Sequence, residues 1–97
     1  MTKSDIIKEI AEGTGLTKVE IEAVLEGVIL CISDSLKRGE RVDLRGFGSF
    51  IVKHRAAREA RNPATREIVK LHERFIPAFK VSKILKEVVN KSLLRGF

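Results

Sequence analysis

The middle of this 97-residue chain contains a stretch that cannot join a hydrophobic core. Residues 54–74, HRAAREARNPATREIVKLHER, are rich in arginine and poor in apolar side chains. Without them roughly 75 residues remain to fold, and a body of that size is only marginally stable alone. We therefore expect a single domain whose core is completed by a second copy, most simply in a two-fold dimer.

Two amphipathic helices are predicted before this stretch. The first has Thr2 as its N-cap with an acid three residues later, and it ends at a pair of glycines that includes Gly15. The second opens on a capping box, Thr17 to Glu20, and ends at Gly39. Its apolar residues recur at helical spacing but cover a wide arc. The surplus apolar surface predicts burial against the second copy.

After residue 40 the apolar period changes from helical to alternating. RVDLR (41–45) and GFGSFIVKHR (46–55) predict two strands joined by a tight hairpin. A third strand is predicted over 67–81, where Pro77 requires an edge or a bulge. Ser82 caps a last helix. The expected α+β domain spans 1–97, with two helices in 1–40, a small antiparallel sheet within 41–81, and a C-terminal helix and tail (82–97).

The charge of the chain is unevenly spread. Residues 1–40 hold five Lys/Arg and eight Asp/Glu, a net charge of −3, whereas residues 41–97 hold fourteen and five, a net charge of +9. A basic half of this kind indicates a polyanionic partner, either nucleic acid or an acidic membrane surface. The membrane alternative lacks a basic amphipathic helix with aromatic anchors.

Several other classes of protein are not favoured by the sequence. Cys31, the single cysteine, cannot form an internal disulfide and is expected to be a small buried hydrophobe. His54 and His72 have no positioned nucleophile, so no enzyme, metal site, cofactor or small-molecule substrate is predicted. No apolar run is long enough for a membrane helix or a signal peptide. A cytoplasmic protein is expected.

The basic stretch itself has two interpretations that its residues leave open. HRAAREAR is rich in helix formers, so it could be a short basic helix that Asn62-Pro63 ends. Alternatively, FIVKHR leads out, NPAT turns and REIVKLHE returns, which makes a β-ribbon. A two-stranded ribbon is marginal in water, so its arginines would need phosphates to order it.

The sequence resembles the bacterial histone-like HU and integration host factor family from Met1 to about Val89. The residues that carry the resemblance are TKSDII at the start, RGFGSF (45–50), the Arg55, Arg58 and Arg61 series, RNP (61–63) with Thr65, PAF (77–79) and KxLK (83–86). The resemblance implies an intertwined dimer with an α-helical dimerisation base (1–40) and two β-ribbon arms, one at about 54–74 of each chain. By this resemblance the arms wrap the minor groove of double-stranded DNA, and Pro63 at each tip wedges into a base step and kinks the duplex.

The resemblance also implies which residues contact DNA. They are Lys3, Arg45, Gly46, Gly48, Lys53, Arg55, Arg58, Arg61, Asn62, Pro63, Thr65, Arg66, Lys70, Arg74, Lys83 and Lys86. Three positions depart from the usual glycine of the family: Ala60, Arg66 and Ser82. A side chain at a positive φ costs stability, so either the tip turn differs or it bears that strain.

The implied function is that of a nucleoid-associated architectural protein of the bacterial cytoplasm, with weak sequence preference and a homodimeric assembly. An alternative is a site-selective DNA-bending subunit like that of integration host factor, which could form half of a heterodimer. The start MTKS and Arg45 favour this alternative. A third alternative is an interaction protein that has kept the fold without the DNA role.

Overall fold

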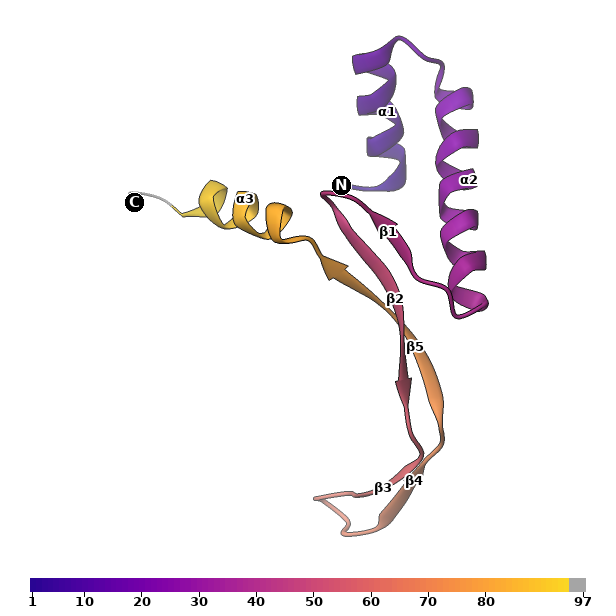
Figure 1. Ribbon diagram of the computed structural model, residues 1–97, viewed down its shortest axis with the longest axis vertical. Helices are drawn as coiled ribbons and strands as arrows, with labels where there is room; N and C mark the ends of the chain where they lie inside the picture. Colours follow the sequence, from indigo (N-terminus) through magenta and orange to yellow (C-terminus); the bar gives the residue numbers. More distant parts are fainter. Residues whose placement is uncertain (95–97) are drawn as a thin grey trace. The chain divides into compact units, whose positions relative to one another are not determined.

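The computed structural model describes residues 1–94, which form three helices and five strands (Figure 1). The elements, in chain order, are α1 (Lys3–Thr14), α2 (Lys18–Lys37), β1 (Val42–Leu44), β2 (Gly48–Arg55), β3 (Arg58–Arg61), β4 (Ile68–Leu71), β5 (Arg74–Val81) and α3 (Lys83–Leu93). They divide into two compact units, the first over Met1–Asp34 and the second from Ser35 onward. The α+β class expected from the sequence is confirmed.

Local side-chain caps set the ends of the helices in the first unit. The Asp5 amide donates to Thr2 Oγ1 at 3.3 Å, and the Thr2 amide donates to Asp5 Oδ2 at 2.8 Å, so the predicted capping box is present. The Thr2 amide, and then the Thr2 hydroxyl, which donates to Asp5 Oδ2 at 3.0 Å, lower the pKa of the Asp5 carboxyl. Gly15 ends α1 at φ 77°, and the Glu20 amide donates to Thr17 Oγ1 at 3.2 Å where α2 begins.

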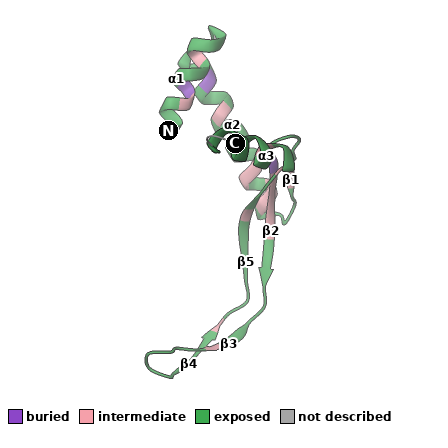
Figure 2. Cartoon of the chain, turned by 90° about the vertical axis from the view of Figure 1, so that its left-hand side faces the viewer, coloured by how far each residue is buried: buried purple, intermediate pink, exposed green. Residues whose placement is uncertain are grey.

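The first unit buries little of its apolar surface within one chain. Among the residues the structure describes, only Ile7 and Ile21 are buried hydrophobic side chains (Figure 2). On α2, Val24 is 68% exposed and Leu30 60% exposed. Cys31 is also exposed, so the expectation that it is buried is wrong for the chain taken singly. Apolar surface on this scale is costly to leave in water.

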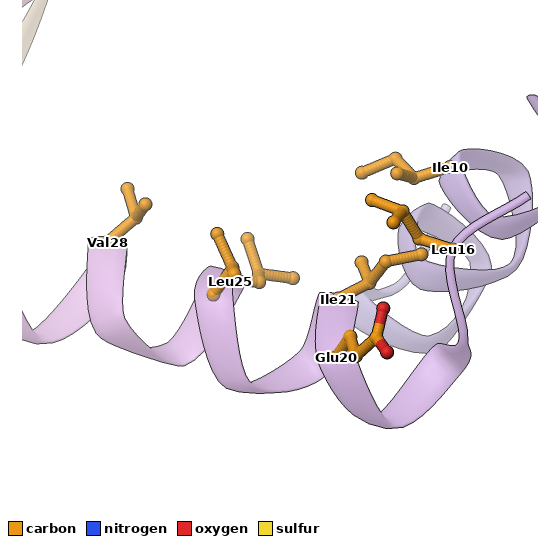
Figure 3. Close-up of a pocket in the computed structure, with 7 residues that line it drawn as sticks. Ile10, Leu16, Glu20, Ile21, Leu25 and Val28 are labelled. Atoms are coloured by element: carbon orange, nitrogen blue, oxygen red, sulfur yellow. The ribbon is translucent and has the colours of Figure 1, made fainter. Parts of the chain in front are cut away.

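An apolar hollow lies against this helix pair. Its volume is about 460 Å³, and Figure 3 shows the side chains that line it pointing into it. They are Ile10, Leu16, Glu20, Ile21, Val24, Leu25 and Val28. Six of these seven side chains are apolar, so the hollow suits an apolar occupant far better than a polar one.

A three-stranded antiparallel sheet of order β1-β2-β5 forms the centre of the second unit. Its hairpin joins β1 to β2 with Val42 opposite Phe50, and the turn contains Gly46 at φ 85°. The long pairing of β2 with β5 runs from Gly48 opposite Val81 to Arg55 opposite Arg74. Pro77 lies on β5, an edge strand, as predicted.

Position 48 requires glycine because neighbouring atoms leave no room for a side chain. A Cβ at this position would lie 2.5 Å from the ring of Phe79 and 2.6 Å from the Lys80 carbonyl oxygen. The Phe79 ring also contacts Phe47 and Phe50, with centroids 5.1 Å apart in both pairs. These three phenylalanines therefore form an aromatic cluster beside the sheet, in which Phe47 is 48% and Phe79 43% exposed in the single chain.

Ser82 links the start of α3 to the β1–β2 hairpin turn. Its Oγ accepts from the Leu85 amide at 3.1 Å, which is the predicted N-cap, and donates to the Gly46 carbonyl at 2.8 Å. Its own amide donates to the Phe47 carbonyl at 3.0 Å. One hydroxyl thus holds a helix terminus and a turn 36 residues apart in the sequence.

We expect Ser82→Ala to lower the free energy of unfolding by about 0.5–2 kcal/mol, because the N-cap bond and the bond to the turn are both lost. Urea unfolding at a fixed protein concentration measures this change in the free energy of unfolding. Ser92→Ala, in the last turn of the same helix, is the control and should change stability little. Equal effects of the two substitutions would contradict the role given to the Ser82 hydroxyl.

Candidate nucleic-acid interface

The basic stretch, which we call the arm (residues 54–74), is a β-ribbon and not a helix (Figure 1). Its outer part pairs β3 with β4 in antiparallel register, from Arg58 opposite Leu71 to Arg61 opposite Ile68. The interpretation of HRAAREAR as a helix is wrong, because cross-strand hydrogen bonds outweigh a weak local propensity. Nearly all of the arm is exposed (Figure 2).

The two faces of the inner ribbon differ in chemistry. Residues directly opposite in an antiparallel ladder share a face, and neighbours along a strand alternate between faces. One face therefore carries Lys53, Arg55 and Arg74. The other carries His54 opposite Phe75, whose rings lie 4.9 Å apart. The register collects cations on one side of the ribbon.

The outer ribbon divides its cations between its two faces, with Arg58 on one face and Arg61 and Lys70 on the other. Glu59 lies opposite Lys70, and opposite charges at facing positions favour the pairing of the two strands. Arg61 shares that face, opposite Ile68, which is 61% exposed. On balance the arm holds six Lys/Arg and three Asp/Glu, a net charge of +3, and it stays attractive to an anion despite its acids.

The tip of the arm is a turn built on Asn62. The Arg66 amide donates to the Asn62 carbonyl at 2.7 Å, and the Asn62 amide donates to the Glu67 carbonyl at 2.9 Å. Asn62 Oδ1 accepts from the Ala64 amide at 2.9 Å, so its NH₂ group is what remains for a partner. Pro63, inside this turn, is exposed.

Among the residues the structure describes, Arg66 is the only non-glycine at positive φ, with a value of 61°. The tip therefore keeps the left-handed turn and bears its strain. Ala60 lies in β3 and Ser82 has φ −69°, so these two departures from glycine need no positive φ.

Outside the arm, a second basic surface lies beside the hairpin turn. A hollow of about 540 Å³ there is lined by the predicted residues Arg45, Gly46, Gly48 and Lys83, together with cations that the sequence analysis missed. The missed cations are Arg41 and Lys80. Their proximity depends on the pairing of β2 with β1 and β5, which no local pattern reveals.

The cations of this surface are not equally free to bind an anion. Arg41 pairs with Asp43 at 2.9 Å, and Asp43 also accepts from the Ser49 hydroxyl. The Ser49 hydroxyl and then Arg41 lower the pKa of Asp43. Because that pKa is lowered, the contribution of Asp43 to stability is present at neutral pH and is lost as pH falls through the folded-state value.

The remaining predicted cations lie elsewhere. Lys86 is on α3, three residues after Lys83 and on the same side of that helix. Lys3 belongs to the first unit, where it forms an ion pair with Glu26 at 3.1 Å. Any anion that binds Lys3 competes with this carboxylate.

Within residues 1–94, no group of three or more His, Cys, Asp or Glu side chains could hold a metal ion. The same part of the chain contains no helix long and apolar enough to cross a membrane.

An α+β chain with a basic β-ribbon arm defines a class of nucleic-acid-binding proteins, and comparison with known sequences gives the family. Residues 1–90 match the bacterial DNA-binding protein family, and the chain belongs to it. It is 45% identical over 98 residues to integration host factor subunit beta of Marinobacter nauticus, covering all of both chains. It is 46% identical over 90 residues to DNA-binding protein HU-beta of Serratia marcescens, covering 93% of this chain and 100% of that one.

Solved structures agree with the sequence comparisons. The structure of HU from Anabaena in a cocrystal with DNA has a TM-score of 0.81 at 37% identity, and the match covers 92% of this chain and 97% of that one. HU from Thermotoga maritima has a TM-score of 0.65 at 28% identity. The resemblance noted in the sequence is confirmed.

The strain at the tip is open to a direct test. We expect Arg66→Gly to stabilise the tip turn by about 1 kcal/mol, because glycine adopts positive φ without the clash that a side chain meets there. Slower hydrogen exchange of the Asn62 amide would report this stabilisation of the turn. The control is Arg61→Gly, the same change at an extended position, where glycine should loosen the ribbon. Faster exchange in both variants would show that Arg66 is unstrained.

Proposed function

We propose that this chain is an architectural protein of the bacterial nucleoid that binds double-stranded DNA in the minor groove and bends it. The observation that carries the proposal is the arm: an exposed two-stranded ribbon with net charge +3 and a proline at its tip. A two-stranded ribbon is only marginally stable in water by itself, and its cations are the groups that phosphates bind. The cocrystal of the Anabaena relative with DNA supports the same partner.

In this proposal the residues of the arm have two roles. Arg55, Arg58, Arg61, Arg66 and the nearby lysines contact phosphates and the groove, while Asn62 and Thr65 contact bases or sugars. Pro63 inserts between base pairs, since a rigid apolar ring without an N–H loses no hydrogen bond when it leaves water. Unstacking a step costs a few kcal/mol, and the bent duplex offsets this by touching more basic surface.

The basic surface beside the hairpin turn is proposed to hold the flanks of the bent duplex. Arg45, Gly46 and Lys83 line it, and Gly46 leaves open space at an exposed turn where backbone can approach a phosphate. Lys83 stands in the first turn of α3, where the positive end of the helix dipole disfavours a cation. A bound phosphate would offset that cost.

The proposed assembly is an intertwined dimer, with residues 1–40 as its helical base. Support comes from the exposed apolar side chains of α2 and from the apolar hollow that Val28 and Leu25 line (Figure 3). A second copy offers the same apolar helices and supplies a second arm. Non-selective binding fits a homodimer.

A site-selective mode is the second candidate. Its support is the relative from Marinobacter nauticus, an integration host factor subunit that matches this chain over its whole length, together with Arg45 beside the hairpin turn. Affinity compared across random duplexes and defined sites separates the two modes: a uniform affinity favours the first, and a preferred site favours the second.

A measurement of DNA bending tests whether Pro63 acts as a wedge. On an end-labelled random duplex of about 40 base pairs, wild type should raise energy transfer between the ends, and Pro63→Ala should bind but reduce the bend by about 20–90° per arm. Pro77→Ala, the other proline, lies on the edge strand β5 and serves as the control with no effect on bending. A full bend from Pro63→Ala would exclude the wedge, and no binding even at low salt would exclude the DNA role.

The dimer is tested at Val28, which is 45% exposed in the single chain and lines the apolar hollow. Val28→Glu should dissociate the dimer and destabilise the fold, because an unpaired charge would be buried at the interface. Sedimentation equilibrium measures the assembly. Val28→Met keeps an apolar side chain and should remain dimeric. A dimeric Val28→Glu protein would place the interface elsewhere.

A further inference from the structure

The arm is interrupted once along its length. The inner ladder ends with Arg55 opposite Arg74, and the outer ladder resumes with Arg58 opposite Leu71. Ala56 and Ala57 on one side, and the two residues across from them, lie outside both ladders. Figure 1 shows the ribbon changing direction at this interruption.

Three arginines surround the interruption. A hollow of about 460 Å³ is lined by Arg55, Arg58 and Arg74 with Ala56 and Ala57. The alanines leave the space open. A water molecule occupies roughly 30 Å³ in the liquid, so the hollow has room for a phosphate group and its hydration.

The pairing of Arg55 with Arg74 is unfavourable for the empty ribbon. Like charges directly opposite in an antiparallel pair destabilise it, with Cβ atoms roughly 4.5–5.5 Å apart. Within residues 1–94, none of the three arginines forms an ion pair with a carboxylate. The ribbon therefore concentrates positive charge at the point where its backbone hydrogen bonding is weakest.

Two acids are adjacent in sequence to this cluster, and neither lies opposite Arg55 or Arg74: Glu59 follows Arg58 and lies opposite Lys70. Glu73 precedes Arg74, but its Oε1 contacts His54 Nε2 at 2.9 Å. His54 lies on the face of the ribbon opposite to Arg55, where its ring also stacks on Phe75. The contact with His54 thus draws Glu73 to the far face and leaves the arginine face unneutralised.

We propose that Arg55, Arg58 and Arg74 form an anion site that binds one phosphate group between the two strands of the arm and stiffens the ribbon at its interruption. Guanidinium groups fit this task because their planar forks match phosphate oxygens in pairs. The phosphate removes the repulsion between Arg55 and Arg74 and couples the outer ribbon to the inner one. The ligand chemistry is a phosphate monoester or diester, from a free anion or from a nucleic-acid backbone. The inference deepens the proposed function, in which the duplex supplies the phosphate.

The site can be tested without DNA. The backbone amides of Ala56 and Ala57 are followed by NMR while inorganic phosphate replaces chloride at constant ionic strength. Wild type should show a saturable shift and increased hydrogen-exchange protection of β3 and β4. Arg74→Gln should weaken the apparent affinity about tenfold, as expected for the loss of one charge-assisted pair. Arg38→Gln removes an exposed arginine that does not line the hollow and has no proposed contact with DNA, and it should leave the affinity unchanged.

Two results would overturn the site: a linear shift equal to that in chloride, or equal losses in the Arg74→Gln and Arg38→Gln variants. His54→Ala provides a second check. It frees Glu73, so phosphate affinity should fall although no arginine is removed, and unchanged affinity would contradict the sorting of charge between the faces.

Binding to a random duplex at low salt separates this inference from the proposed function. Saturable phosphate binding without DNA binding would support the site and refute the DNA role. DNA binding and bending without a saturable phosphate response would refute the site and leave the DNA role intact. With both present, Arg74→Gln should also reduce the protection of β3 and β4 in the DNA complex, which shows that a backbone phosphate occupies the hollow.

Discussion

The apolar surface that one chain leaves uncovered is the constraint on which the rest of the structure depends. Ile7 and Ile21 are the only buried hydrophobic side chains among the described residues, while Val24 and Leu30 on α2 are largely exposed. The hydrophobic effect is the main source of stability, so a chain with so small a core needs more apolar contact than it can supply itself. A chain that devotes 21 of its 97 residues to an exposed arm cannot avoid this requirement.

Features that depend on residues close in sequence could be predicted. The caps at Thr2, Thr17 and Ser82 and the glycine turn at Gly46 follow from local chemistry, and each is present. The second role of Ser82 could not be foreseen, because the Gly46 carbonyl that it binds is 36 residues away. Likewise Arg41 and Lys80 meet only through strand pairing.

The arm shows why the candidate site was predicted only in part. Its arginines were identified, but HRAAREAR is compatible with either a helix or a strand, and local propensity cannot choose between them. The single interruption between Arg55 and Arg58 depends on the register of both ladders, which no pattern in the sequence fixes. At the tip, glycine would fit the left-handed turn without cost, yet Arg66 occupies it and adds a positive charge.

The acids of the arm illustrate how register turns a modest net charge into a strong local one. Glu59 faces Lys70 in the outer ribbon, and Glu73 contacts His54 on the far face of the inner ribbon. Neither acid therefore lies opposite Arg55 or Arg74 on the inner face. Six cations and three acids leave a net charge of only +3, whereas this arrangement places arginine directly opposite arginine. Strand pairing, more than composition, therefore determines how strongly the arm attracts an anion.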